Sequence, residues 1–295
     1  MASEPGQTLV RDAAPPRIVF ACRRAPDWSA LSRDFRAGRP IARARYLPPE
    51  PVPGFPRAIG SYISRWNRTF RIDFFTFRAE IAALSRASVA RVANSASVAS
   101  DDPALVDLAK ANPGALIYFH DDDDFFAPNI AEATASADPA CDVVVTPLFR
   151  VGIPTFTFVP PDVQPTVLWG DARACDMHFQ SNNYGIRAGG AAGGSKLAAF
   201  ADHVAASEHA DRTALRITYL ADPVSATVKT PGSASMLRRV FGPRAMLLDM
   251  LGRSGRRDGV FEAFGPAVDA NALPEEYRWA SDPANRIAAL VASVR

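Results

Sequence analysis

Cysteine is scarce in this chain of 295 residues. There are three, Cys22, Cys141 and Cys175, and their spacing matches no metal-ligand pattern. An odd and unpatterned set of thiols suits a reducing compartment rather than a disulfide framework. No apolar run approaches the roughly 20 residues that span a bilayer, and the N-terminus lacks the basic-then-apolar pattern of a signal peptide. These absences predict a cytoplasmic protein.

A large excess of either charge is also missing. The net charge is +2, with 48% hydrophobic and 22% charged residues, which is typical of a globular domain. This balance does not by itself indicate or exclude a polyanionic partner, and we expect no nucleic acid partner. The glycine-rich run at 189–196 is not a P-loop, because its Lys and Ser stand in the wrong order and no buried strand precedes it.

Short apolar runs that predict strands alternate along the chain with segments whose apolar residues have helical spacing. This alternation is typical of an α/β fold. Little regular structure is expected from 165 to 194, and Pro154 predicts an edge strand at 151–159. Strands are expected at 17–22, 115–119, 141–146, 215–220 and 224–228. Helices are expected at 27–35, where Trp28, Leu31 and Phe35 share one apolar face, and at 78–92. The tail 1–16 is expected to fray.

A buried strand that ends in four carboxylates organises the chain. The run Ala115 to Phe119 is short and continuously apolar, and Asp121-Asp122-Asp123-Asp124 follow one residue later. Burying four adjacent carboxylates without a counter-cation would cost several kcal/mol. If the strand continued, Asp121 and Asp123 would face one way and Asp122 and Asp124 the other. One pair would then face a cation and the other solvent or a ribose. A solvated acidic turn or a Ca²⁺ site is the alternative interpretation.

This stretch resembles the Asp-x-Asp region of A-type (nucleotide-diphospho-sugar) glycosyltransferases, and most of all bacterial rhamnosyltransferase-like enzymes. The resemblance covers Ala115 to Ile130, with looser similarity as far as Ser235. It implies a Mn²⁺ or Mg²⁺ ion on Asp121, Asp123 and Asp124, and nucleotide contacts from Asp121 and Asp122. Oxygen ligands suit such hard ions, which are commonly shared with substrate phosphates.

Residues outside the Asp run complete the expected site. Arg23 follows the first strand, where an Arg can meet a phosphate, although a surface Arg capping the strand is an equal alternative. Asn182 and Asn183 lie in a polar, aromatic segment and are expected to bind sugar hydroxyls, or else to form Asx turns. The resemblance places a carboxylate base after the metal cluster. Glu208 is the first candidate and Asp211 the second, although His209 stands where the family pattern has Asp.

The C-terminal part is basic. Residues 236–257 hold six Arg and one Asp, a local charge of +5, together with Met, Leu and Phe. Such a segment packs as an amphipathic helix or docks on anionic lipid at the inner face of the membrane. The expected organisation is a flexible tail at 1–16, a catalytic α/β domain at 17–235 and a helical region at 236–295, packed on the domain or docked on the membrane.

These observations predict a three-layer α/β sandwich with a Rossmann-like, mostly parallel central sheet. The expected activity is transfer of a hexosyl or deoxyhexosyl group, with inversion, from a nucleotide-diphospho-sugar to a saccharide or lipid-linked saccharide acceptor, in polysaccharide or glycoconjugate synthesis. A metal-dependent nucleotidyl- or phosphoryl-transfer enzyme, which also clusters Asp at a strand end, and a non-catalytic cation-binding module remain alternatives.

Overall fold

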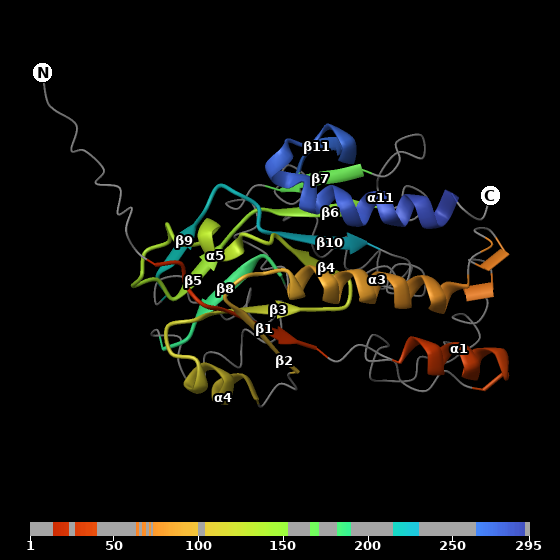
Figure 1. Ribbon diagram of the computed structural model, residues 1–295, viewed down its shortest axis with the longest axis horizontal. Helices are drawn as coiled ribbons and strands as arrows, with labels where there is room; N and C mark the ends of the chain where they lie inside the picture. The colour runs from red at the N-terminus through yellow and green to blue at the C-terminus, as the bar shows by residue number, and fades with distance from the viewer. Residues whose placement is uncertain are drawn as a thin grey trace, which may run out of the picture.

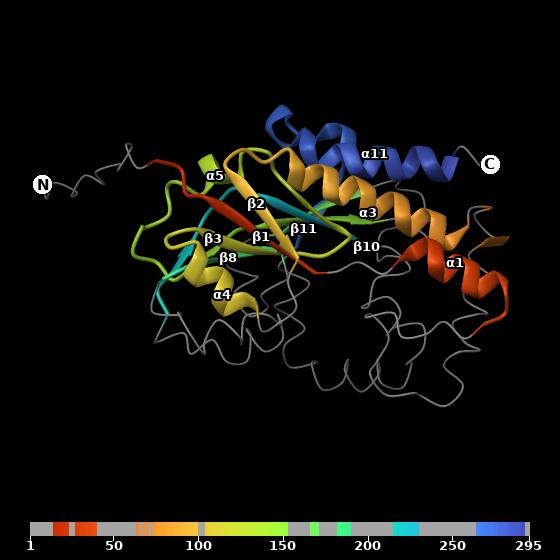
Figure 2. The same ribbon diagram turned by 60° about the horizontal axis from the view of Figure 1, so that its bottom comes forward.

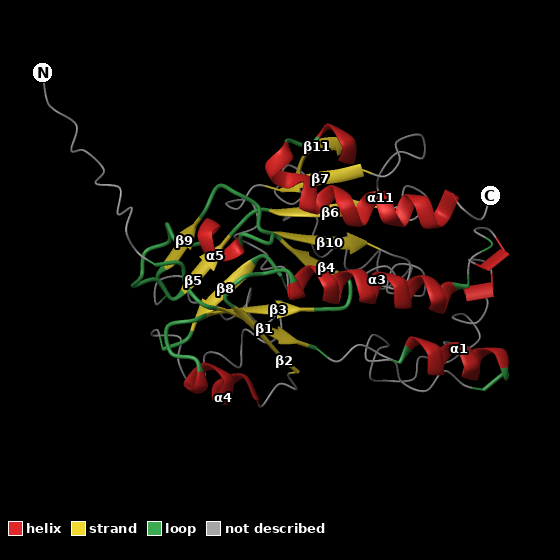
Figure 3. Cartoon of the chain, in the orientation of Figure 1, coloured by secondary structure: helices red, strands yellow, loops and turns green. Residues whose placement is uncertain are grey.

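The computed structural model describes a little over half of the chain (Figures 1 and 3). Among these residues no helix combines the length and apolar character needed to cross a membrane. The described residues are 14–23, 27–39, 63–64, 67–68, 71, 73–99, 104–152, 166–170, 182–189, 215–229 and 264–292.

The fold contains two sheets, of which the first is a mixed sheet of six strands. Its order is β2-β1-β3-β8-β5-β9, and β8 runs antiparallel to both of its neighbours, so the other five strands share one direction. The α/β class is therefore confirmed. The strands are β1 (Ile18–Cys22), β2 (Ser95–Ala99), β3 (Leu116–His120), β5 (Val143–Val145), β8 (Tyr184–Arg187) and β9 (Ile217–Tyr219).

Apolar side chains bury both faces of this sheet, which explains why β1 and β3 are continuously apolar rather than alternating. On one face, Val19 and Ile117 pack with Leu108 from α4 (Ala104–Ala111). On the other, Phe20 and Tyr118 pack with residues of α3 (Phe74–Ala90) and α5 (Ile130–Ala133). Figure 2 shows α4 and α3 on opposite sides of the strands.

A second sheet of five strands, ordered β11-β7-β6-β10-β4, continues from the first. Helices α3 and α11 (Arg278–Ala292) cover it, because side chains from both helices join one apolar cluster with β4, β6 and β10. The strands are β4 (Asp124–Phe126), β6 (Leu148–Gly152), β7 (Thr166–Gly170), β10 (Ser225–Lys229) and β11 (Phe264–Asp269). Two short 3₁₀ helices, at Ala270–Ala272 and Glu275–Tyr277, lead into α11.

An aspartate side chain caps the N-terminus of each of two helices, α1 and α3, that contribute contacts to the Asp run. The Asp27 side chain accepts a hydrogen bond from the Ala30 backbone N–H at the start of α1 (Trp28–Arg36), and Asp73 accepts one from Thr76 at the start of α3. Each cap satisfies a backbone donor that the helix itself leaves unpaired.

Of the edge strand expected at 151–159, the structure describes only Val151 and Gly152, which end β6, and β6 lies between β7 and β10. Other local expectations were wrong. The interval 165–194, expected to be irregular, contains β7 and β8, and β2 was not expected at all. The C-terminal part contributes strand β11, paired with β7, in addition to helix α11. The domain boundaries at 16 and 235 stay predictions, and segment 236–257 lies outside the described residues.

Candidate functional site

The four aspartates form the passage from one sheet to the other. Strand β3 of the six-stranded sheet ends at His120, residues 122 and 123 form a turn, and Asp124 begins β4 of the five-stranded sheet. The Asp124 backbone N–H donates to the Asp121 carbonyl at 3.2 Å across this turn. The expected continuation of the strand was therefore wrong, and the carboxylates do not simply alternate between two faces.

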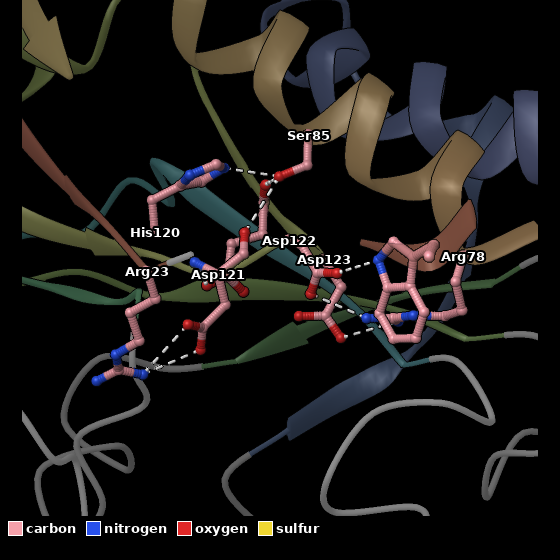
Figure 4. A network of polar contacts seen from close by, with 9 residues as sticks. Arg23, Arg78, Ser85, His120, Asp121, Asp122 and Asp123 are labelled. Carbon is pink, nitrogen blue, oxygen red and sulfur yellow. Dashed lines mark hydrogen bonds and ion pairs between the residues drawn. The ribbon is translucent and has the colours of Figure 1, made fainter. Parts of the chain in front are cut away.

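Asp122 and Asp123 turn toward helix α3. The Arg78 Nη2 lies 2.9 Å from Asp122 Oδ1, and its Nη1 lies 3.5 Å from Asp123 Oδ2. The Trp28 Nε1–H donates to Asp122 Oδ2 at 2.9 Å, and the Arg78 guanidinium lies 4.8 Å from the centre of the Trp28 ring. Arg78 is completely buried. Figure 4 shows Arg78 reaching Asp122 and Asp123 from one side.

Asp121 points toward the end of strand β1 (Figure 4). The Arg23 Nη1 contacts both carboxylate oxygens of Asp121, at 3.1 and 3.3 Å, and the guanidinium lies 5.3 Å from the centre of the Phe119 ring. The side chains of Arg23 and Asp121 are 18% and 16% exposed. The pair is thus accessible to a ligand from solvent, in contrast to the buried Arg78–Asp122 pair.

Asp124 is held by residues of both sheets. Its Oδ1 accepts from Thr227 Oγ1 at 2.9 Å and from Asn182 Nδ2 at 3.0 Å, and its Oδ2 accepts from the Asp121 backbone N–H at 3.0 Å. Thr227 stands directly opposite Asp124 on β10, whereas Asn182 precedes β8. Asp124 is 1% exposed. These contacts favour a structural role for this carboxylate over the expected role as a metal ligand.

A buried histidine contacts the turn through Ser85. The His120 Nε2 lies 2.6 Å from Ser85 Oγ, which lies 2.6 Å from the Asp124 carbonyl oxygen. Because a carbonyl oxygen only accepts, Ser85 donates to Asp124 and His120 donates from Nε2 to Ser85. Burial lowers the pKa of His120 to about 4, although the charges of Asp121 and Asp122 oppose this effect. The histidine is therefore neutral at physiological pH.

The structure brings most of the expected site residues into one network. Arg23, Asn182 and the Asp run are joined by the contacts above. Asn183 is fully buried and its Nδ2 donates to the Thr146 carbonyl at 3.4 Å, so this donor points away from the Asp run. Asn182 is also fully buried, and sugar contacts by either residue stay a prediction. The expected bases Glu208 and Asp211 lie outside the described residues.

Side chains that contact the Asp run but were not expected there include Arg78, Ser85, Trp28 and Thr227. Arg78 and Ser85 are seven residues apart, so two turns of α3 place them on the same face, where Arg78 contacts the carboxylates and Ser85 the backbone of the turn. The sequence signal that could have revealed Arg78 and Ser85 was their polar character on the inner face of the helix expected at 78–92. Trp28 was assigned to the apolar face of its helix, and its indole N–H was overlooked.

The chemistry of the network fits a divalent cation that is shared with a substrate. Four Asp and two Arg side chains carry a formal charge of −2 between them. Asp121 and Asp123, whose side chains are 16% and 11% exposed, are the two most accessible carboxylates of the run. The described residues contain no group of three His, Cys, Asp or Glu arranged around a common point. Mg²⁺, however, is commonly held by one or two carboxylates plus substrate phosphates.

A buried amide lies next to the run. The Asn182 Oδ1 is buried and has no hydrogen-bond partner in the described part of the chain. The Nδ2 of the same amide contacts Asp124 and lies 2.6 Å from Thr227 Oγ1. A buried amide oxygen of this kind normally has a partner, such as a water, a hydroxyl group or a cation.

Comparison with known proteins adds no relationship to these observations. Neither the models of known protein families nor the curated proteins contain a match to this sequence.

Proposed function

We propose that this protein is a metal-dependent glycosyltransferase with a Rossmann-like, A-type fold, which transfers a sugar from a nucleotide-diphospho-sugar to a hydroxyl acceptor. The observation that carries the proposal is the position of the Asp run. It follows β3 at the carboxyl end of a strand whose neighbour β1 runs in the same direction, with His120 paired to Cys22 at their ends.

This position is where α/β sheets bind ligands. In sequence, the chain goes from β1 to β2 on one side and then to β3 on the other side of β1. Ligands of open α/β sheets bind outside the carboxyl ends of the strands at such a reversal. The Arg23–Asp121 pair spans this point, since Arg23 follows β1 and Asp121 follows β3.

Under this proposal the residues of the network have three roles: binding the cation, binding a phosphate and holding the turn. Asp121 and Asp123 would hold Mn²⁺ or Mg²⁺, and the bound cation would stabilise charge on the leaving diphosphate. Arg23 would bind a phosphate oxygen, as guanidinium groups do. Asp122 and Asp124 hold the turn through Arg78, Trp28, Asn182 and Thr227, and these contacts make Asp122 a poorer candidate for a nucleotide contact than Asp121.

The transfer itself needs a base. A carboxylate, Glu208 or else Asp211, takes the proton of the acceptor hydroxyl. The oxygen of the acceptor hydroxyl then forms a bond to the anomeric carbon while the bond from that carbon to the diphosphate breaks, which inverts the configuration. The substrates would be held together by binding, which makes the displacement effectively unimolecular.

Calorimetry with a panel of UDP-, GDP- and dTDP-sugars, with and without Mn²⁺, tests the proposal. We expect one donor class to bind only with the metal, and Asp123→Asn to abolish this binding. Asp107→Asn is the matched control, because Asp107 is a carboxylate of α4 that is 82% exposed and pairs with Lys110. If no donor binds in the presence of Mn²⁺, the proposal fails, and phosphoryl transfer or a non-catalytic cation-binding module becomes the better interpretation.

A further inference from the structure

Four described strands lie at the edges of the two sheets: β2, β9, β4 and β11. An edge strand exposes backbone N–H and C=O groups, and proteins normally protect it by shortness, proline, charge or a bulge. Strands β9 and β4 have three residues each, and β11 contains Pro266 and a shift of register between Phe264 and Ala267. Strand β2, Ser-Ala-Ser-Val-Ala, has none of these features and pairs with β1 over all five residues without a shift.

The outer side of β2 is accessible (Figure 1). In the described part of the chain, β1 is the only strand that pairs with β2. Val98 and Tyr219 are the two exposed large apolar side chains among the described residues, at 37% and 36%. Ser97, beside Val98, is exposed as well. An apolar side chain on an unprotected strand edge is typical of a surface that a further strand covers.

The ladder with β1 decides which backbone groups of β2 face this outer side. The Ile18 N–H donates to the Asn94 carbonyl, and Ile18 stands opposite Ser95. In a parallel ladder every second residue directs both its N–H and its C=O to the same neighbour. Ala96 and Val98 therefore face β1. The residues whose N–H and C=O groups point to the outer side are Ser95, Ser97 and Ala99.

We propose that β2 is a dimerisation strand, which pairs antiparallel with β2 of a second copy of this chain across a two-fold axis at Ser97. In this register Ser97 stands opposite the partner's Ser97, and Ser95 stands opposite the partner's Ala99. Outward-facing residues thus meet outward-facing residues, and each such pair exchanges two backbone hydrogen bonds. A shift by one residue would place inward-facing groups opposite outward-facing ones, so the backbone itself selects this register.

The side chains of β2 favour a second copy as the partner, because the strand is complementary to itself. Val98 stands opposite the partner's Ala96 in a non-hydrogen-bonded pair, where opposite side chains come closest. Apolar therefore meets apolar on this face. Both residues stand beside Val19 and Ala21 of β1, which belong to the apolar cluster that includes residues of α4. The second copy extends this cluster across the interface.

Sedimentation velocity of the full chain tests the proposal. One strand pair buries less area than a standard interface, so we expect the mass to rise with concentration, from 31.7 kDa toward twice this value. Val98→Lys should raise the dissociation constant at least about tenfold, because it brings two ammonium groups to one face of the paired strands. Tyr219→Lys is the matched control, since it makes the same change at the other exposed apolar residue, on β9, and should leave the dissociation constant unchanged.

Hydrogen exchange of the unaltered protein locates the interface. At high protein concentration, the outward-facing amides should exchange at least about tenfold more slowly than at low concentration. The amides of Ala96 and Val98, which face β1 in monomer and dimer alike, should change less and serve as the internal control. The outward-facing amides are those of Ser95, Ser97 and Ala99.

A chain that stays monomeric up to about 1 mM, the range of the weakest specific interfaces, would overturn the proposal. So would a dimer whose dissociation constant is the same for Val98→Lys as for Tyr219→Lys, because its interface would then lie elsewhere. If circular dichroism shows that Val98→Lys does not fold, the exchange measurement decides: protection of the outward-facing amides supports the proposal, and its absence in the dimer refutes it.

Discussion

Replacing Asp124 by Asn separates a structural carboxylate from a metal ligand. The change keeps the size of the side chain, and its remaining oxygen can still accept from Thr227 and Asn182. The new NH₂ group, however, then faces the Asp121 backbone N–H, which is a donor. If the amide is turned the other way, the contact with Asp121 is kept and that with Asn182 is lost, while the Thr227 hydroxyl has to accept instead of donating. At least one hydrogen bond to a charged group therefore disappears in either orientation.

The expected loss of stability follows from these contacts. A hydrogen bond to a charged group contributes about 1.5–3 kcal/mol, and a buried donor left without a partner has a similar cost. The bonds that remain also weaken, because their acceptor is no longer charged. We therefore expect Asp124→Asn to lower the free energy of unfolding by about 2–4 kcal/mol in the absence of metal.

Urea unfolding in EDTA, followed by far-ultraviolet circular dichroism, measures this difference. Thr227→Val should cost about 1 kcal/mol, and the double variant should cost less than the sum, because both changes break the same contact. Asp107→Asn should stay within about 0.5 kcal/mol of the unaltered protein. A loss for Asp124→Asn of that same small size, combined with abolished Mn²⁺ binding, would refute the structural role and favour the expected metal ligand.

Three further perturbations have expected outcomes. Arg23→Met should tighten Mn²⁺ binding up to about fivefold, because an accessible ion pair of at most about 1 kcal/mol no longer competes for Asp121; an EPR titration measures it. Gly185→Ala should destabilise the protein by about 1–3 kcal/mol in urea unfolding, because a Cβ would lie 2.6 Å from the ring of Tyr118 on the neighbouring strand. Between about pH 6.5 and 4, metal-free stability should fall by about 3 kcal/mol through His120, since the unfolded state binds the proton first.

Each of these outcomes has its own control. Arg39→Met removes a charge from an exposed pair, and an equal gain in Mn²⁺ affinity there would show that the effect of Arg23 is only that of net charge. Gly38 has open space around its Cβ position but a φ of +65°, so Gly38→Ala reports strain without a clash, and a larger loss there would contradict the reasoning for Gly185. His120→Gln should remove the additional pH dependence, and an unchanged pH profile would assign it to other groups.

The sequence predicted the local elements well where one physical pattern dominated. The continuous apolar runs of β1 and β3 marked strands buried on both faces, and the spacing of Trp28, Leu31 and Phe35 marked α1. It failed where pairing decided the outcome. Strand β2, Ser-Ala-Ser-Val-Ala, has no strong β preference and forms because β1 offers it a free edge. The roles of Glu208 and Asp211 stay predictions.

The sequence by itself determined that four carboxylates follow directly after a buried strand, because that is a property of neighbouring residues. Only the tertiary structure decided what each carboxylate does. Asp122 meets Trp28, 94 residues earlier, and Asp124 meets Thr227, 103 residues later. Such partners are brought together by the order and direction of strands in two sheets, and no local pattern encodes which of four identical side chains faces an arginine, a threonine or solvent.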